Sequence, residues 1–314
     1  MNILVFGTGV IGTIYGNILA ESGNRVTHYV RPGKKTLIEN GIRIQLLDGR
    51  SKSSNEREVV YRPNVVESLS SEGTYDLCIL SVRHYQLAAA LSALKGRIGT
   101  TDVLIFNGNW DGLEGINEQI APSQYLWGFP VAGGGFNEQG LKGALLNEIH
   151  LGELNGELTP RLFRIRDLFE GAGIKADIQP NMLHWLWVHF AINSGVIGAA
   201  FKAGGASDLL NSVTHLRKAI LAGREALAVC QARGVDISSF QDAKAFALPP
   251  LIGALAVWLT MKTNRPARRI FETHSAIEEL QVIYRDVLKT GRELNVSMPN
   301  YSALEEYVHS FRAH

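Results

Sequence analysis

A glycine-rich turn directly follows the first apolar run of the chain and constrains the fold more than any other feature. The run covers residues 2–6, and an apolar helical pattern continues after the turn to about Glu21. The turn consists of Gly7, Thr8, Gly9, Val10, Ile11 and Gly12. A strand, a Gly-x-Gly-x-x-Gly turn and a helix in this order form the dinucleotide-binding fingerprint. The sequence therefore predicts that these six residues bind the pyrophosphate of a nucleotide cofactor.

Each glycine of the turn has a separate predicted role. Gly7 lets the chain turn sharply, Gly9 has no Cβ to block the pyrophosphate, and Gly12 lets the helix lie close to the sheet. The first turn of the helix adds N–H groups and the positive end of its dipole, which favour phosphate. A turn with a purely structural role is the alternative, and the strand and helix patterns on either side of the glycines disfavour it.

The end of the second predicted strand, residues 25–30, distinguishes between the two nicotinamide cofactors. Proteins that bind NAD usually have an Asp or Glu there, which accepts hydrogen bonds from the ribose. Here Arg31 follows the strand, Lys34 and Lys35 come next, and the turn contains no acid. A guanidinium group can stack on adenine and pair with a 2′-phosphate. A solvated basic loop is the alternative, but the position of Arg31 favours NADP.

Composition excludes several classes of protein. With 314 residues the chain can form two domains, and 31 basic against 30 acidic residues indicate neither a nucleic-acid nor a membrane partner. Cys78 and Cys230 lie in apolar runs, which indicates core positions rather than a disulfide framework. The chain shows no signal-peptide pattern and no apolar run long enough to span a bilayer. We therefore expect a cytoplasmic protein.

Strand and helix patterns alternate up to residue 180, which is typical of a doubly wound sheet. Residues 42–47 and 59–61 look like additional strands, and residues 48–58 like a polar turn or mobile loop between them. Amphipathic helical patterns then replace the strands, at about 182–199, 209–233, 252–261, 268–294 and 301–311. The sequence predicts an α/β fold: a Rossmann-type NADP-binding domain over 1–180 and an all-α substrate domain over 181–314. In such a pair the substrate normally binds between the domains, beside the nicotinamide.

Several stretches together resemble the ketopantoate reductase family, the NADPH-dependent 2-oxo acid reductases of pantothenate biosynthesis. They are the glycine turn, Arg31, Ser81-Val82-Arg83-His84-Tyr85-Gln86, Phe106-Asn107-Gly108, the helix over 186–193, and residues 291–299. The resemblance covers essentially the whole chain. It implies that Arg83, at the position of a family lysine, and Gln86 contact cofactor or substrate, and that Asn107 lies near the nicotinamide.

The helical part departs from the family at one informative position. The family signature reads approximately Trp-Arg-Lys-Leu-x-x-Asn, and its lysine is the general acid that protonates the ketone oxygen. Trp187 and Asn193 match this signature, but His189 stands at the lysine position. A second family asparagine falls on Ile197, and the late family glutamate falls on Glu279. The resemblance thus implies His189 as the acid, Asn193 as a polar anchor and Glu279 as partner of the substrate hydroxyl or of the acid.

Histidine can replace the lysine chemically, because hydride addition to a ketone forms an alkoxide that needs a proton donor, and imidazolium is one. A packing role for His189 stays open, since a histidine on an apolar helix is more often structural. We expect an NADPH-dependent oxidoreductase that reduces a small 2-oxo acid or related carbonyl to the alcohol. The alternative is a non-catalytic NADPH-binding sensor or regulator of the same ancestry.

The remaining expectations concern metals and oligomers. His150 and His215 have no partner at ligand spacing along the sequence, so no metal site is predicted. The apolar helix at 251–259 could pack in a homodimer. The sequence does not name the substrate.

Overall fold

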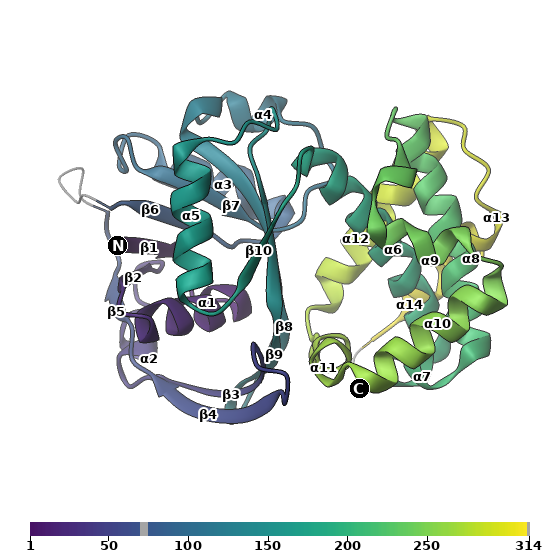
Figure 1. Ribbon diagram of the computed structural model, residues 1–314, viewed down its shortest axis with the longest axis horizontal. Helices are drawn as coiled ribbons and strands as arrows, with labels where there is room; N and C mark the ends of the chain where they lie inside the picture. Colours follow the sequence, from purple (N-terminus) through teal and green to yellow (C-terminus); the bar gives the residue numbers. More distant parts are fainter. Residues whose placement is uncertain (70–74, 313–314) are drawn as a thin grey trace. The chain divides into compact units, whose positions relative to one another are not determined.

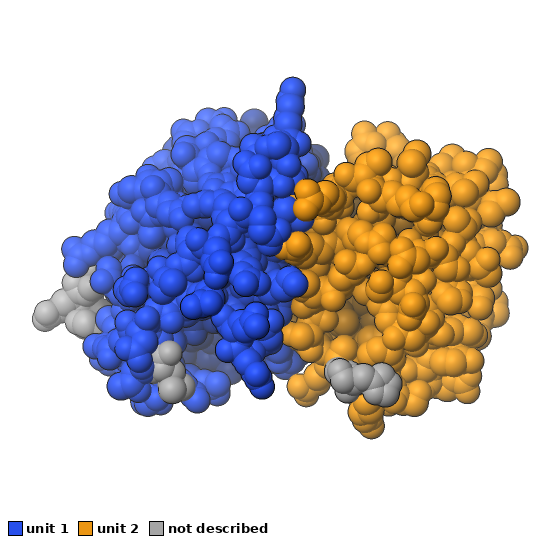
Figure 2. Space-filling model, turned by 90° about the horizontal axis from the view of Figure 1, so that it is seen from below, with its two compact units in different colours: residues 1–183 blue, residues 184–314 orange. Residues whose placement is uncertain are grey.

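The computed structural model describes residues 1–69 and 75–312, which form two compact units (Figures 1 and 2). Unit 1 is Met1–Leu183 and unit 2 is His184–His314. The described part of unit 1 holds a ten-stranded sheet with helices, and the described part of unit 2 consists of helices and loops. The predicted fold class, a Rossmann-type α/β domain followed by a helical one, is confirmed.

The parallel part of the sheet carries the glycine turn. Its strands are β1 (Asn2–Phe6), β2 (Arg25–Tyr29), β5 (Asn64–Val66), β6 (Leu77–Leu80) and β7 (Asp102–Phe106). They pair in the order β7-β6-β1-β2-β5. The connecting segments contain α1 (Val10–Glu21), α2 (Thr36–Glu39), the 3-10 helix η1 (His84–Gln86) and α3 (Leu87–Leu94). All four residues of β6 are buried, as expected for a strand with both faces covered.

Longer strands extend the sheet beyond β7. The connection after β7 contains α4 (Glu114–Asn117) and η2 (Pro122–Gln124), and the further strands are β8 (Tyr125–Asn137), β9 (Gly140–Gly152), β3 (Ile42–Gly49), β4 (Asn55–Tyr61) and β10 (Lys175–Ile178). β8 pairs with β7 in parallel and with β9 antiparallel. The other edge of β9 pairs first with β3 and then with β10. Residues from two distant parts of the chain thus line one edge of β9.

The predicted loop over residues 48–58 is wrong in part. β3 continues to Gly49 and β4 already begins at Asn55, so the loop is shorter than expected. β4 is the last strand of the sheet, and most of its side chains are exposed or half-buried. Polar residues are common on such an edge strand, which is why this one resembled a loop. β5 was not predicted at all.

One apolar core joins the sheet to two helices. α1 and α5 (Pro160–Gly171) cover the same face of the sheet (Figure 1). Tyr15 of α1 contacts Phe106 of β7 and Phe169 of α5, with ring centroids 4.8 and 5.9 Å apart. Because α1 follows the glycine turn, this core fixes the start of the helix against the sheet.

The helices of unit 2 are more broken than the sequence suggested. They are α6 (Met182–Ala203, which begins at the end of unit 1), α7 (Ala206–Asn211), α8 (Val213–Ala232), η3 (Ile237–Ser239), η4 (Gln241–Ala243), α9 (Lys244–Ala247), α10 (Pro250–Thr263), α11 (Arg265–Thr273), α12 (Ile277–Glu293), α13 (Pro299–Ser302) and α14 (Glu305–Ser310). The predicted helix 209–233 is divided at Ser212, whose Oγ accepts a hydrogen bond from the N–H of His215 and caps α8. The predicted helices 268–294 and 301–311 are divided as well. The amphipathic pattern continues across these helix ends, so it did not reveal where one helix ends and the next begins.

Small residues let α6 approach α8 closely. A Cβ at Gly195 would lie 2.6 Å from the backbone nitrogen of Gly223. The two cysteines are buried as predicted, and burial raises the pKa of the Cys78 and Cys230 thiols to about 12. The close crossing packs α6, which carries His189 and Asn193, directly against α8.

One face of α10 is apolar and exposed. Leu251, Ile252, Leu255 and Leu259 are each 46–59% exposed. A helix was predicted over these residues, and its apolar side chains are exposed. A homodimer formed through this face stays a prediction. Among the described residues, no helix is long and apolar enough to cross a membrane.

Candidate functional site

The parallel strands place most of the predicted cofactor residues along one edge of the sheet. β7, β6, β1 and β2 are neighbours with the same direction, so their carboxyl ends lie side by side. The segments that follow these ends contain Asn107, residues 81–83, the glycine turn and Arg31. In open α/β sheets ligands bind outside the carboxyl ends of the strands. The fold therefore brings residues from four separate segments to the expected edge.

The glycine turn has the geometry that a phosphate site needs. Gly7 adopts φ +97°, a conformation that favours glycine, and a Cβ at Gly9 would meet no protein atom within 4 Å. A Cβ at Gly12 would lie 3.0 Å from Ser81 Oγ and 3.2 Å from Val5 Cγ1, so here the helix does approach the sheet closely. The remaining members of the turn are Thr8, whose carbonyl accepts a hydrogen bond from Thr13, and Val10 and Ile11, which begin α1. The first N–H groups of α1 have no acceptor within the helix, and the start of a helix favours an anion.

Two buried polar atoms at this edge have unused hydrogen-bonding capacity. Asn107 donates through Nδ2 to the carbonyl of Val82 at 2.7 Å, and its own carbonyl accepts from Trp127 Nε1 at 2.8 Å. Asn107 Oδ1 and Ser81 Oγ are buried and bond to none of the residues that the structure describes. A buried acceptor without a donor costs about 1–3 kcal/mol. A carboxamide or hydroxyl group of a bound nicotinamide nucleotide would satisfy these atoms, so the residues present fit such a cofactor. The sequence indicated Ser81 only as part of the family motif.

The basic residues predicted around the cofactor lie on the surface. Arg31 is exposed after β2, and Gln86 is exposed at the end of η1. Arg83 is half-buried, and its guanidinium donates to the hydroxyl of Tyr85 at 3.0 Å. The fold adds one acid that the sequence pattern did not reveal: Glu67, which follows β5, accepts a hydrogen bond from the backbone N–H of Lys35 at 2.9 Å. The turn itself contains no acid, but its neighbourhood is less basic than predicted.

A buried histidine forms a hydrogen bond with the backbone of the glycine turn. His28 of β2 donates through Nδ1 to the carbonyl of Gly7 at 2.8 Å, since a carbonyl can only accept. Burial favours the neutral ring, in which Nε2 accepts a hydrogen bond from the hydroxyl of Tyr61 at 3.0 Å. Burial lowers the pKa of His28, although the bond to Gly7 opposes this effect. No local sequence pattern indicated this role.

The neutral His28 predicts how stability depends on pH. Because its folded pKa lies below the usual value near 6.5, the unfolded chain binds more protons under acidic conditions. This contribution to stability should be complete above about pH 6.5 and should fall by up to about 1.4 kcal/mol per pH unit below it. Chemical denaturation from pH 7.5 to 5 measures the slope, and His28→Gln should flatten it. An unchanged slope in the variant would contradict the neutral, buried state.

In unit 2, α6 carries the predicted proton donor. His189 and Asn193 are one helical turn apart and share a face. The ring of Trp185 stacks on that of His189, with centroids 4.8 Å apart and planes at 14°. His189 Nδ1 lies 3.4 Å from Asp242 Oδ2 in η4. Asp242 was missed because it is 53 residues away along the chain.

The other predicted residues of unit 2 occupy different positions. Ile197, at the place of the second family asparagine, is 8% exposed and belongs to the core. Glu279 lies half-buried in the first turn of α12, and the carboxylate placed beside His189 is that of Asp242. Asp242 is thus a carboxylate beside His189 in addition to the Glu279 that the family resemblance implies.

A second group lies on another side of α6. The guanidinium of Arg233 lies 3.5 Å from the ring centre of Trp187, and His184 stacks on the same ring at 5.5 Å. Burial and the charge of Arg233 lower the pKa of His184. The matched family tryptophan therefore contacts His184 and Arg233 rather than His189, whose stacking partner is Trp185.

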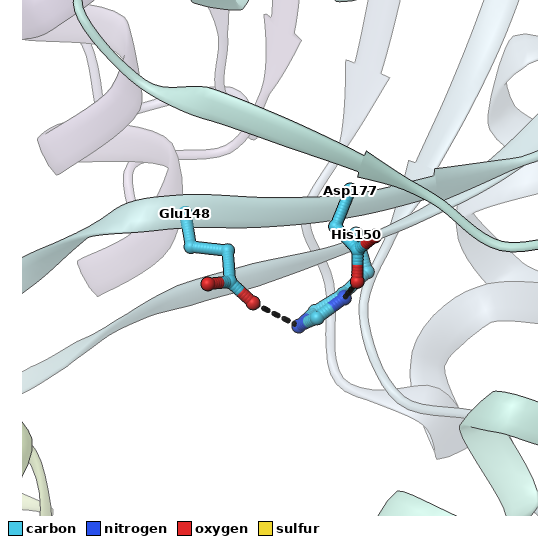
Figure 3. Close-up of side chains that lie close together, drawn as sticks. All are labelled: Glu148, His150 and Asp177. Atoms are coloured by element: carbon cyan, nitrogen blue, oxygen red, sulfur yellow. Dashed lines mark hydrogen bonds and ion pairs between the residues drawn. The ribbon is translucent and has the colours of Figure 1, made fainter. Parts of the chain in front are cut away.

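The expectation that His150 has no partner at ligand spacing is wrong. His150 Nε2 lies 3.3 Å from Glu148 Oε1, and His150 Nδ1 lies 3.1 Å from Asp177 Oδ2 (Figure 3). One atom from each of the three side chains lies within 4.8 Å of the others. The prediction failed because Asp177 is brought to His150 by the pairing of β10 with β9.

The glycine turn at the start of a parallel sheet and the helical unit that follows define a Rossmann-type protein with a helical second unit. A model of the family described as Ketopantoate reductase PanE/ApbA matches residues 3–155. The 2-dehydropantoate 2-reductase of Vibrio cholerae is 25% identical over 98% of this chain and 97% of its own. That of Pyrococcus horikoshii is 28% identical over 64% of both chains. Residues 3–155 thus match the ketopantoate reductase family, and the similarity to the Vibrio cholerae enzyme extends over nearly the whole chain.

Solved structures agree on the fold. The 2-dehydropantoate 2-reductase of Porphyromonas gingivalis has a TM-score of 0.71 at 18% identity, over 99% of both chains. A D-mandelate dehydrogenase solved with NADH and anilino(oxo)acetate has a TM-score of 0.75 at 18% identity, over 99% of this chain and 97% of its own. At such identities the similarity shows only a common fold, and proteins with different names have this fold.

Proposed function

We propose that this protein is an NADPH-dependent reductase that converts a small 2-oxo acid or related carbonyl into the alcohol. The observation that carries the proposal is that the open glycine turn and the unsatisfied Asn107 Oδ1 both follow carboxyl ends of the parallel strands, where such folds bind nucleotides. The names of the relatives support the substrate class, since 2-dehydropantoate is a 2-oxo acid.

Unit 1 would bind the cofactor, which supplies the hydride. The N–H groups at the start of α1 would hold the pyrophosphate, and the missing Cβ of Gly9 leaves room for it. Asn107 Oδ1 would accept a hydrogen bond from the nicotinamide amide, and Arg31 would pair with the 2′-phosphate. Arg83 and Gln86 stay proposed contacts on the strength of the family resemblance.

Unit 2 would supply the proton. A protonated His189 can donate to the alkoxide oxygen, and the carboxylate of Asp242 lies 3.4 Å from Nδ1 of its ring. Asn193 on the same face can donate or accept a hydrogen bond from the substrate. Glu279 is proposed to bind the substrate hydroxyl.

Replacing Arg31 tests the choice of cofactor. We expect Arg31→Ala to weaken NADPH binding about tenfold or more, equivalent to about 1.4 kcal/mol, because the 2′-phosphate loses its partner. NADH affinity should hardly change. Isothermal titration calorimetry measures both, and Arg97→Ala, also an exposed arginine of unit 1, is the matched control. Equal affinities of the wild-type protein for NADPH and NADH would overturn the assignment.

The competing function is an NADPH sensor without catalysis, and the change of the family lysine to His189 together with the buried Ile197 favours it. Oxidation of NADPH with a panel of 2-oxo acids, ketopantoate and aryl-substituted acids included, separates the two. A reductase oxidises NADPH with at least one member of the panel. A sensor binds NADPH and oxidises it with none.

A further inference from the structure

The cluster of Glu148, His150 and Asp177 is created by strand geometry. Glu148 and His150 are two residues apart on β9, so their side chains leave the same face of the sheet. Asp177 of β10 is the direct cross-strand partner of His150. His150 is 8% exposed, whereas the Glu148 and Asp177 side chains are 47% and 50% exposed. The cluster thus has a buried imidazole and two carboxylates that solvent can reach.

The position of Asp177 fixes the state of the imidazole. Its Oδ2 lies 3.1 Å from His150 Nδ1 and also accepts a hydrogen bond from Gln179 Nε2 at 2.6 Å. The same Gln179 Nε2 lies 3.3 Å from His150 Nδ1, but a carboxylate can only accept, so the bond between Asp177 and Nδ1 requires a hydrogen on Nδ1. In the neutral ring this leaves a lone pair on Nε2, the atom that faces Glu148. Figure 3 shows the two carboxylates at different nitrogens of the ring.

This arrangement requires a positive species between Nε2 and Glu148. The lone pair of a neutral imidazole and a carboxylate oxygen 3.3 Å apart repel each other unless a proton or a metal ion lies between them. A separation of 3.3 Å suits two ligands of one ion at about 2.1 Å each in tetrahedral geometry. A histidine that donates its other N–H to a carboxylate is the usual supporting arrangement of a metal ligand.

We propose that His150 Nε2 and Glu148 bind a divalent transition-metal ion such as Zn²⁺, with Asp177 as the carboxylate that orients the imidazole. Water completes the coordination, because the ligand side is open to solvent. An imidazole ligand disfavours Mg²⁺ and Ca²⁺, which prefer oxygen. The ion neutralises the two carboxylates and ties β10 to β9.

The site lies on the same edge of the sheet as the proposed cofactor site. Phe129 of β8 pairs with His150, and its neighbour Gly128 pairs with Phe106, the residue before Asn107. The ion would therefore lie two strands from Asn107, within unit 1. The proposal is independent of the proposed function, since it predicts binding of the metal alone.

The test is a titration of tag-free protein with Co²⁺, followed by the visible absorption of the ion, and with Zn²⁺ by calorimetry. We expect one ion per chain with the absorption of tetrahedral cobalt. Glu148→Gln should weaken binding about tenfold or more, Asp177→Ala about 10–100-fold, and His150→Ala should abolish it. His309→Gln is the matched control, because His309 Nε2 lies 3.8 Å from Glu305 in an exposed pair on α14.

Each outcome supports or overturns the metal site. Weaker binding in Glu148→Gln, which replaces an exposed side chain, together with unchanged binding in His309→Gln supports the site even if His150→Ala folds poorly. A wild-type protein without stoichiometric binding would overturn the proposal and leave a proton as the species between the two groups. The proposal is equally wrong if Glu148→Gln and His150→Ala bind the ion as tightly as the wild type.

Discussion

Replacing His189 by alanine should reduce turnover roughly 10²–10⁴-fold, the usual contribution of a positioned proton donor. NADPH affinity should hardly change, because the glycine turn and Arg31 belong to unit 1. The pH profile of the wild-type rate should differ from that of the variant, which lacks the proton donor. Steady-state kinetics across pH on the best substrate measures both effects.

Variants around His189 separate an acid from a packing residue. Asp242→Asn should lower turnover less than His189→Ala does, since it removes only the charge beside the ring. His189→Lys restores the family residue and should keep or raise activity toward ketopantoate. His184→Ala, on the same helix but stacked on Trp187, is the matched control. If His189→Ala keeps its rate per folded molecule and its pH profile, the histidine only packs.

Gly9→Val should abolish cofactor binding while the protein still folds. A Cβ at Gly9 meets no protein atom within 4 Å, and its backbone has φ −67°, so the chain itself tolerates the side chain. The branched group instead fills the space that the pyrophosphate needs. Fluorescence titration with NADPH and thermal unfolding measure the two effects.

Gly115→Val is the matched control for Gly9→Val. Gly115 in α4 also has open space around its Cβ position, but it lies outside the turn. This variant should bind NADPH like the wild type. If Gly9→Val binds NADPH normally, the turn does not hold the cofactor.

The parts of the fold that could be predicted are those with strong local patterns. The strand, glycine turn and α1 follow one another without a gap, and buried β6 is a continuous apolar run. The first part of β4 was missed because an edge strand is polar, and the breaks at Ser212 and near His274 were missed because amphipathic periodicity continues through a cap. Local sequence patterns carry little information on strand pairing or helix ends.

The candidate site likewise contains residues that local sequence patterns predict and residues that they do not. The glycine turn and Asn107 follow strands directly, so their place at the edge of the sheet could be expected. Asp242 is 53 residues from His189, and Asp177 is 27 residues from His150. Such pairs arise from tertiary packing and strand pairing, and one sequence does not show them.

The most direct test of the proposed reaction follows the hydride itself. NADPH carrying deuterium at both C4 positions is mixed with the protein and the 2-oxo acid panel, and the products are analysed by mass spectrometry and NMR. A reductase must yield a 2-hydroxy acid with one deuterium on C2, together with an equal amount of NADP⁺. If NADPH binds but no 2-hydroxy acid with deuterium on C2 forms from any member of the panel, the protein is not the reductase proposed here.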